Sequence, residues 1–400
     1  MTNQVQSPTL SGHAGQIGNS AATMPTSGIR DVMTEVLNVS GIINLAPGEP
    51  SFPTPRHIVD AGIDALNSGR TKYTHHAGIA ELRVELCRKL SEENGIGVAP
   101  DDVVVTHGAM GALYSAYLAL LDPGDEILLP DPGWPNFRMM AALRSATVRE
   151  YTLTREGGFV PDVEQLEDLI SDKTRVILIN SPLNPVGSVL TRDQVAEIVE
   201  LANKYRIWII SDEAYERITY DVPHVSAGSV DPHGRVVSVF SFSKTYAMTG
   251  WRVGYAVAKP EVARVIANLQ EATISCANAP GQWAALAALT GPQAVIGDMN
   301  LEYARRMKNA QTILKENGVE YFDPGGAFYL WIDVTSSGVS SAAFSRSLMD
   351  RYRVAVVPGS AFGSSGQGYV RTSVASSESD VSTGISFLAQ HVRELADGHV

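Results

Sequence analysis

Short apolar runs rich in β-branched residues alternate with helical segments between residues 100 and 260, and this alternation restricts the fold more than any other feature. The segment 191–205, for example, has the spacing of an amphipathic helix, and Thr191 is a suitable N-cap residue. Repeated strand–helix–strand units with Val- and Ile-rich strands predict an α/β fold with a mostly parallel sheet covered on both faces. The apolar runs lie at 103–106, 126–130, 147–153, 175–180, 207–211, 236–241 and 253–258.

The chain has 400 residues, which exceeds the size at which one hydrophobic core stops growing, so two domains are expected. From about residue 291 the alternation gives way to longer amphipathic helices and short strands. We predict a large domain over 51–290 and a smaller α+β domain over 291–400, which residues 24–50 join as an N-terminal arm. Residues 1–23 are polar, carry no Lys, Arg, Asp or Glu, and are predicted to be a disordered tail.

Composition argues against several classes of protein. The net charge of −12 and the absence of Lys and Arg clusters disfavour a nucleic-acid partner. No run of about 18 apolar residues occurs, and the N-terminus lacks the basic and apolar regions of a signal peptide, so no membrane association is predicted. The two cysteines, Cys87 and Cys276, form no Cys-x-x-Cys pair, which disfavours structural zinc and fits a reducing, cytoplasmic compartment.

Polar residues of unusual type follow the predicted strands, at the edge where parallel sheets bind ligands. Lys244 stands in the stretch SFSKTYAMTGWR, directly after the run at 236–241. Asp212 follows the run at 207–211, and a carboxylate at the end of a buried strand is costly unless it meets a cation or hydrogen-bond donors. Taken singly, Lys244 is typical of a solvated surface, and Asp212 fits a structural role as well as a functional one.

Other strand ends also have two interpretations. The stretch THGAMGAL opens a helix whose first N–H groups, at Gly108, Ala109 and Met110, could receive a phosphate, although many strands turn into helices through glycine. Trp134 in DPGW is either a core aromatic or a flat surface for a ligand ring. The asparagines of NSPLNPVG are also ordinary turn residues.

If these strand ends converge, one pocket contains a lysine, an aspartate, a tyrosine, an asparagine, a tryptophan, serines, an arginine and a helix N-terminus. A ligand with a phosphate, a flat ring, a cationic ring nitrogen and an aldehyde would use all of them. Pyridoxal 5′-phosphate is such a ligand.

From about Gly28 to its end, the chain resembles the class I and II aminotransferases, which are fold type I pyridoxal-phosphate enzymes. The stretch SFSKTYAMTGWRVGY is similar to the lysine signature of that family. Seven other motifs occur in the family's order, namely GEPSF, KYTHHAGIAELR, THGAMGAL, DPGW, NSPLNPVG, SDEAY and GYVRTS. The resemblance implies a large domain with a mostly parallel seven-stranded sheet between helices, and a smaller α+β domain.

The resemblance also implies catalytic and ring-binding roles. Lys244 would form a Schiff base with the cofactor and later shuttle the substrate proton. Asp212 would keep the ring nitrogen protonated, and Tyr215 and Asn184 would hydrogen-bond the 3-oxygen of the ring. Trp134 would stack on the ring.

The same resemblance assigns the phosphate and the substrate. Arg371 would hold the substrate α-carboxylate in a two-pronged ion pair, and Gly48 would lie in the segment that closes over the substrate. Trp134 and Asn184 would also bind the substrate. The implied assembly is a homodimer whose sites are shared across the interface. The phosphate-binding residues would be Gly108, Ala109, Met110, Ser241, Ser243, Arg252 and, from a neighbouring subunit, Tyr73.

Two departures from the family pattern bear on function. Some aspartate-using relatives have a lysine in GGKQAL where this chain has Met110 in GAMGAL, which favours a neutral or aromatic substrate side chain. Aspartate remains the alternative substrate, if another arginine supplies the charge. His75 and His76 lie on a predicted loop, and we assign no metal to them.

The predicted function is an aminotransferase that exchanges an amino group between an L-amino acid and a 2-oxo acid by a ping-pong mechanism. A β-eliminating C–S lyase of the same fold stays open, because both reactions begin by removing the same proton. A cofactor-sensing regulator would carry a DNA-binding module, for which the segment before Gly28 is too short. A nicotinamide-dependent oxidoreductase is disfavoured because no Gly-x-Gly-x-x-Gly follows a strand.

Overall fold

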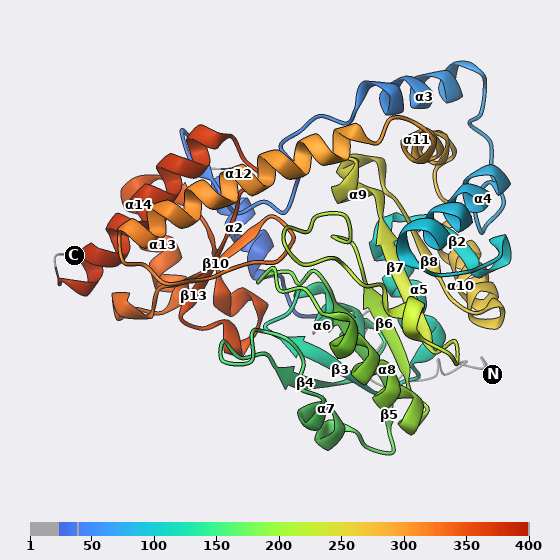
Figure 1. Cartoon of the computed structure of the whole chain (residues 1–400), viewed down its shortest axis with the longest axis horizontal. Coiled ribbons are helices and arrows are strands. Elements are labelled where there is room, and N and C mark those ends of the chain that lie inside the picture. Colours follow the sequence, from blue (N-terminus) through green and yellow to red (C-terminus); the bar gives the residue numbers. More distant parts are fainter. Residues whose placement is uncertain (1–23, 38–39, 399–400) are drawn as a thin grey trace, which may run out of the picture.

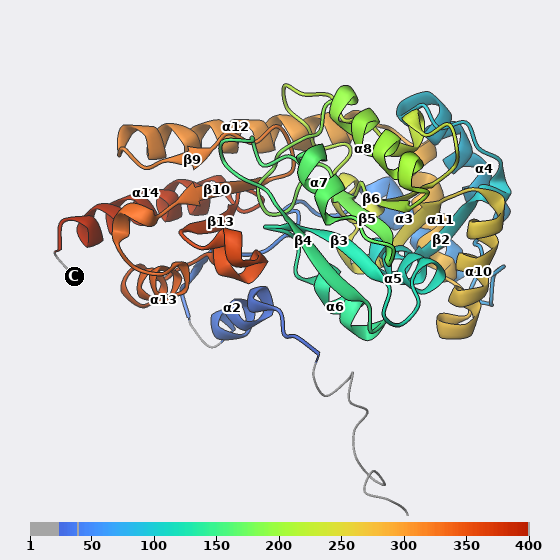
Figure 2. The same ribbon diagram turned by 90° about the horizontal axis from the view of Figure 1, so that it is seen from below.

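The computed structural model describes residues 24–37 and 40–398. The disordered tail predicted for residues 1–23 lies outside these residues. Figures 1 and 2 show a body built around one large sheet, with a second group of helices and strands at one side.

A seven-stranded sheet forms the centre of the larger group, in the order β2-β8-β7-β6-β5-β3-β4. Neighbouring strands are parallel except at β8, which runs antiparallel to both β2 and β7. Each of the seven predicted apolar runs forms one of these strands, so the predicted α/β fold with a mostly parallel sheet is confirmed. The strands are β2 (Val103–His107), β3 (Glu126–Asp131), β4 (Thr147–Thr152), β5 (Thr174–Asn180), β6 (Trp208–Asp212), β7 (Val236–Ser241) and β8 (Val253–Val257).

Helices cover both faces of this sheet because successive strand residues point to opposite sides. In β3, Ile127 and Leu129 belong to a cluster with residues of α5 (Gly108–Leu120), α6 (Asn136–Leu143) and α10 (Pro260–Ile274). Leu128, between them, packs instead with residues of α7 (Val163–Leu169) and α8 (Arg192–Tyr205). The other helices of this group are α3 (Arg56–Asn67), α4 (Ala80–Lys89), α9 (Phe242–Thr245) and α11 (Ala279–Thr290).

The start of α8 shows how local sequence sets the boundary of a helix. The Thr191 hydroxyl accepts a hydrogen bond from the Gln194 N–H, and the Gln194 side chain accepts one from the Thr191 N–H. These two bonds satisfy backbone donors that the first turn of a helix leaves unpaired. The predicted N-cap at Thr191 is therefore confirmed.

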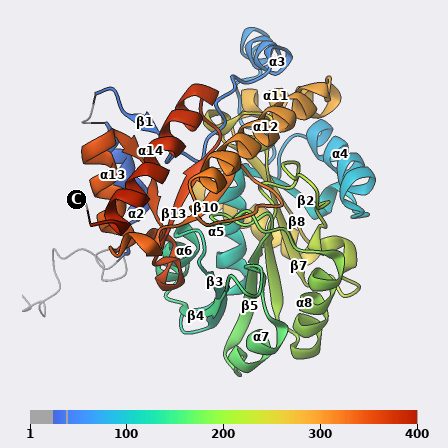
Figure 3. The same cartoon turned by 60° about the vertical axis from the view of Figure 1, so that its left-hand side comes forward.

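The second group is built on a four-stranded antiparallel sheet in the order β12-β13-β10-β9. Residues of the N-terminal arm lie beside it, because β1 (Ile43–Asn44) pairs in parallel with β11 (Val354–Ala355), and Figure 3 shows α2 (Gly28–Val36) next to α13. The other elements are α12 (Ala294–Glu316), β9 (Tyr321–Phe322), β10 (Tyr329–Asp333), α13 (Ser341–Tyr352), β12 (Val357–Pro358), β13 (Tyr369–Ser373) and α14 (Glu378–Ala396).

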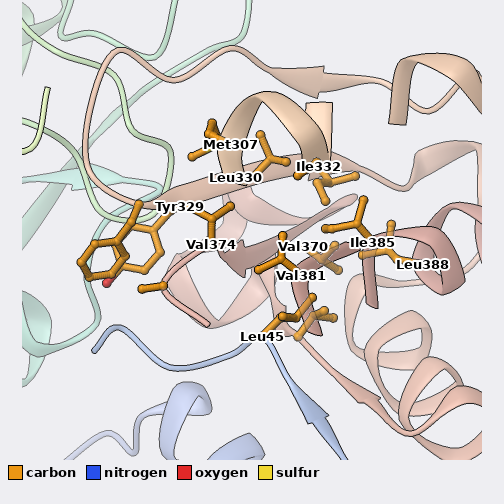
Figure 4. Close-up of a cluster of buried hydrophobic side chains, with 14 of the residues drawn as sticks. Leu45, Met307, Tyr329, Leu330, Ile332, Val370, Val374, Val381, Ile385 and Leu388 are labelled. Carbon is orange, nitrogen blue, oxygen red and sulfur yellow. The ribbon is translucent and has the colours of Figure 1, made fainter. Parts of the chain in front are cut away.

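The two groups have separate clusters but also share core packing. Figure 4 shows the cluster of the second group, in which Leu330 of β10 and Ile385 of α14 lie with Leu45 of the arm. A second cluster crosses between the groups, since Trp331 and Phe362 pack with strand residues such as Ile177. In Figure 1, α12 also runs from the second group to α9 and α11 of the first. The domain boundaries at residues 50 and 290 therefore stay predictions.

Membrane insertion was not expected from the sequence. Across residues 24–37 and 40–398, no helix combines the length and the apolar character that a membrane span requires.

Candidate active site

A cavity of about 300 Å³ lies where the carboxyl ends of β5, β6 and β7 meet the second group of elements. It brings together every residue predicted for the site except Gly108 and Tyr73. The residues that line it are Ile29, Gly48, Ala109, Met110, Trp134, Asn180, Asn184, Asp212, Ala214, Tyr215, Ser241, Ser243, Lys244, Arg252, Tyr329 and Arg371.

Lys244 enters this cavity from α9, the short helix that follows β7. Ser241 caps this helix, because its hydroxyl accepts a hydrogen bond from the Ser243 N–H at 3.1 Å. The Lys244 ammonium donates to the Gly48 carbonyl at 2.5 Å. Burial lowers the pKa of Lys244 to about 8, with Arg252 acting in the same direction. A substantial fraction of the lysine is therefore neutral, and able to act as a nucleophile or base, at mildly alkaline pH.

Asp212 ends β6 and is buried, with an exposed fraction of 4%. Burial raises its pKa to about 7, and the neighbouring Glu213 acts in the same direction, whereas the Ala214 N–H opposes the shift. The Asn180 side chain donates to the Asp212 carbonyl at 2.9 Å and ties the ends of β5 and β6 together. A cationic ligand group beside Asp212 would favour the charged carboxylate and reverse the effect of burial.

One end of the cavity has the donors of an anion site. Ala109 and Met110 line it from the first turn of α5, where backbone N–H groups lack helical partners. The Arg252 guanidinium packs so closely over Gly108 that a Cβ there would lie 2.4 Å from Arg252 Nη2. Gly108 therefore does not line the cavity but allows Arg252 to approach the helix end, with Ser241 and Ser243 alongside.

Arg371, in β13, is buried at the other end of the cavity, with an exposed fraction of 1%. It donates to Asn184 Oδ1 at 2.8 Å and to the Ala46 carbonyl at 2.6 Å, while its Nε has no hydrogen-bond partner among the described residues. No carboxylate of the described chain pairs with it, although buried charges are normally paired. An anionic ligand group is the natural partner for this guanidinium.

Two tyrosines lie between these ends. The hydroxyls of Tyr215 and Tyr329 are 2.6 Å apart and hydrogen-bonded, and both rings are buried. Burial raises the pKa of Tyr215, so Tyr215 is protonated at neutral pH and can donate a hydrogen bond.

The remaining wall is largely apolar. Trp134 makes an edge contact with Phe137 of α6, at 5.5 Å between ring centroids, which holds the indole at the cavity. Met110 from α5 and Ile29 from α2 also line it.

Four cavity residues were not assigned from the sequence: Ile29, Asn180, Ala214 and Tyr329. Asn180 was visible as part of NSPLNPVG, and its support of Asp212 follows from the strand pairing. Tyr329 gave no signal, because the AFYLW run has the composition of an ordinary core strand.

Tyr73 is highly exposed, at 88%, and does not line the cavity. Its predicted role from a neighbouring subunit stays a prediction. The rings of His75 and His76 are stacked with centroids 4.2 Å apart, and no cluster of three or more metal-ligating side chains occurs within the described residues.

The residues present fit pyridoxal 5′-phosphate. The N-terminal end of α5, Arg252 and the two serines are suited to bind a phosphate. Lys244 is suited to react with an aldehyde, and the buried Asp212 is suited to pair with a cationic ring nitrogen. Arg371 remains for the carboxylate of a second molecule, the substrate. This combination, at the carboxyl edge of a mostly parallel sheet, defines a fold type I pyridoxal-phosphate enzyme.

Comparison with known proteins identifies the family. The model of the family "Aminotransferase class I and II" matches residues 40–388, and the chain belongs to this family. It is 39% identical to an aspartate aminotransferase of Thermotoga maritima over 84% of this chain and 87% of the relative. Its fold matches the aspartate aminotransferase of Thermus thermophilus with maleate, with a TM-score of 0.91, 33% identity, and coverage of 94% and 99% of the two chains. An aromatic aminotransferase of Pyrococcus horikoshii matches with a TM-score of 0.86, 35% identity, and coverage of 92% and 99%. The protein is thus a pyridoxal-phosphate-dependent aminotransferase.

Proposed function

We propose that this aminotransferase prefers L-amino acids with neutral or aromatic side chains and transfers their amino group to a 2-oxo acid. The observation that carries the proposal is the charge of the cavity. Among the described residues that line it, the charged ones are Asp212, Lys244, Arg252 and Arg371. Each has a role at the cofactor or the α-carboxylate, so none is left for a second substrate carboxylate.

The apolar wall supports the same preference. Met110 and Ile29 offer hydrocarbon and thioether surface, and Trp134 offers an aromatic face. Burying a carboxylate against such a wall without a cation is strongly unfavourable. A neutral or aromatic side chain would instead gain from removal of its apolar surface from water.

Aspartate is the second candidate, because relatives from Thermotoga maritima and Thermus thermophilus carry the name aspartate aminotransferase. The relative from Pyrococcus horikoshii, at similar identity, is named an aromatic aminotransferase. Family membership alone therefore does not decide between aspartate and an aromatic amino acid as the substrate. Use of aspartate by this chain would require a cation outside the cavity lining described above, for example from a partner subunit.

We propose the following division of work in the reaction. When bound, pyridoxal phosphate supplies the aldehyde that accepts the amino group and the ring that withdraws electrons from the substrate α-carbon. Arg371 holds the α-carboxylate of the substrate. Lys244 is partly neutral because burial lowers its pKa, so it removes the α-proton and returns it at the aldehyde carbon of the cofactor. Asp212 holds a proton at the ring nitrogen, while Tyr215 and Asn184 donate to the ring oxygen.

We also propose that the enzyme is a homodimer with shared sites. A wide hollow of about 660 Å³ adjoins the cavity and shares Arg252 with it, and His107 and Asn278 line it too. An exposed Tyr73 from a second copy would reach the phosphate end through this hollow. A Tyr73→Phe chain mixed with a Lys244→Ala chain should regain activity in the mixed dimer, because one of its two sites is then complete. A fully active monomer at all concentrations would contradict the proposal.

The substrate proposal is tested by a half-reaction screen. Each L-amino acid is added singly to the purified holoenzyme, and loss of the visible absorption of the bound cofactor is followed. We expect rapid conversion by aromatic and branched neutral amino acids and slow conversion by aspartate. Faster conversion by aspartate would contradict the preference, and release of pyruvate and ammonia without a 2-oxo acid would instead indicate the C–S lyase.

A cytoplasmic location is a further proposal. It is supported by the two cysteines, Cys87 and Cys276, which are both free thiols in the structure. Cell fractionation that recovers the protein outside the cytoplasm would contradict it.

A further inference from the structure

Tyr329 is a buried residue that touches two functional side chains at once. It lies in β10, and its exposed fraction is 1%. In Figure 4 it lies at the opposite end of the hydrophobic cluster from Ile385 and Leu388. Its ring and its hydroxyl contact different partners, so the two halves of the side chain can be considered separately.

The ring of Tyr329 contacts the Arg371 guanidinium. Strand pairing brings them together, because Trp331 lies opposite Arg371 and Tyr329 lies two residues further along the same face. The Arg371 guanidinium carbon is 4.2 Å from the centroid of the Tyr329 ring and 4.9 Å from that of Phe362. Aromatic faces attract a cation without neutralising its charge. They therefore hold Arg371 in place and leave it available for a substrate carboxylate.

The hydroxyl of Tyr329 meets the hydroxyl of Tyr215 at 2.6 Å. Each phenol has one proton to donate. If Tyr215 donates to the ring oxygen of the cofactor, as proposed above, it accepts from Tyr329. A donor that itself accepts a hydrogen bond is polarised and donates more strongly. The Tyr329 hydroxyl thus strengthens the bond that Tyr215 makes to the cofactor.

Gly48 provides the space for this arrangement. A Cβ at Gly48 would lie 2.3 Å from the Tyr329 hydroxyl oxygen, so any larger residue would displace the phenol. The same glycine places its carbonyl 2.5 Å from Lys244 Nζ. Close approach of this backbone segment to two polar side chains explains why a residue without a side chain stands there.

We propose that Tyr329 is a positioning residue that links the two ends of the active site, with its ring orienting Arg371 and its hydroxyl polarising Tyr215. This proposal rests on the roles of Arg371 and Tyr215 given under the proposed function. It does not depend on which amino acid is the substrate. Tyr329 acts through these two neighbours and is not itself a catalytic residue.

Two substitutions separate the two halves of the side chain. Tyr329→Phe keeps the ring and removes the hydroxyl, whereas Tyr329→Leu removes the ring as well. Tyr303→Phe is the matched control, because Tyr303 is buried in the same cluster and does not line the cavity. Its hydroxyl has no hydrogen-bond partner within residues 24–37 and 40–398.

The first measurement is a pH titration of the visible absorption of the bound cofactor. A weaker bond from Tyr215 to the ring oxygen should move the midpoint upward by roughly half a pH unit to one unit in Tyr329→Phe. Tyr303→Phe should titrate like the wild type. An unchanged midpoint in Tyr329→Phe would overturn the role of the hydroxyl.

The second measurement is the half-reaction with whichever amino acid the wild type converts fastest. In Tyr329→Leu, the apparent dissociation constant should rise by roughly tenfold, because Arg371 loses one of its two aromatic faces. Tyr329→Phe should keep the wild-type dissociation constant. Equal dissociation constants in the wild type, Tyr329→Phe and Tyr329→Leu would overturn the role of the ring. If Tyr329→Leu does not fold, the test is Tyr329→Phe. This variant keeps the ring, so a raised dissociation constant would overturn the role of the ring. A wild type that converts only aspartate would contradict the proposed substrate preference. The pH titration and the half-reaction would still compare the Tyr329 variants validly with the wild type.

Discussion

Lys244 Nζ and the Gly48 carbonyl oxygen are 2.5 Å apart, although 195 intervening residues separate them along the chain. The lysine follows β7 of the seven-stranded sheet, and the glycine lies in the arm whose strand β1 pairs with β11 of the second group. The central residue of the site is therefore hydrogen-bonded to a segment held by the other part of the molecule.

Substituting Lys244→Ala should abolish transamination and the visible absorption of the bound cofactor, because no other lysine lines the described cavity. The far-ultraviolet circular dichroism should remain that of the wild type. Lys204→Ala is the control, since Lys204 is exposed and pairs with Glu167 far from the cavity. Measurable turnover in Lys244→Ala would contradict the assignment of this lysine.

Substituting Arg371→Lys should raise the Michaelis constant by roughly a hundredfold, because an ammonium cannot form the two parallel hydrogen bonds of a guanidinium with a carboxylate. The loss should appear for every amino acid, since all carry the α-carboxylate. Steady-state kinetics with two different substrates measure it. Arg346→Lys, at an exposed position on α13, should leave the Michaelis constant unchanged.

The raised pKa of Asp212 predicts a dependence of apoenzyme stability on pH. Burial raises this pKa from 3.8 to about 7, so between those pH values the folded protein keeps a proton that the unfolded chain releases. This group therefore favours folding at low pH, and its contribution is lost as the pH rises toward 7. Asparagine has no charge to bury. The free energy of unfolding of Asp212→Asn, relative to that of the wild type, should therefore rise by on the order of 3 kcal/mol from pH 4 to pH 8.

Urea unfolding of the cofactor-free protein at several pH values measures this difference. Asp193→Asn, at an exposed position in the first turn of α8, should retain the pH dependence of the wild type. Parallel stability curves for Asp212→Asn and the wild type would show that Asp212 is not the group responsible. Transamination by Asp212→Asn should fall at every pH, because the ring nitrogen loses its partner.

Substituting Met110→Lys should shift the preference toward aspartate, because it places a cation on the apolar wall of the cavity. We expect the ratio of kcat/KM for aspartate to that for a neutral amino acid to rise by about tenfold, the gain from one partly exposed charge pair. Met110→Leu keeps the wall apolar and should not change the ratio. An unchanged ratio in Met110→Lys would show that the substrate side chain does not reach this wall.

The strands and most of the site could be predicted from the sequence because both depend on local patterns. Runs such as 175–180 are continuous and apolar, and the residues that follow them are carried to one edge by the parallel arrangement. Asp212, Asn184 and Ser241 were found in this way. Their positions need only the order of the strand ends.

Tyr329 and Ile29 could not be predicted in the same way, because they reach the cavity from the second group of elements. Their positions depend on how that group packs against the sheet, which involves contacts such as those of Trp331 with the shared cluster. Such long-range packing leaves no periodic signal near either residue. The role predicted for Tyr73 rests on the family resemblance alone, since its contact would be made in a second subunit.

The reversed direction of β8 explains why two cavity residues, Lys244 and Arg252, stand so near each other in the sequence. Arg252 directly precedes β8, and since this strand runs against β7, its start lies at the edge where β7 ends. A parallel strand would place that start about 17 Å away, at the opposite edge, and would need a crossover of a dozen residues or more to reach it. The tight reversal thus allows Lys244 and Arg252 to lie within one segment of twelve residues, SFSKTYAMTGWR. An insertion between Lys244 and Arg252 would increase the distance between them.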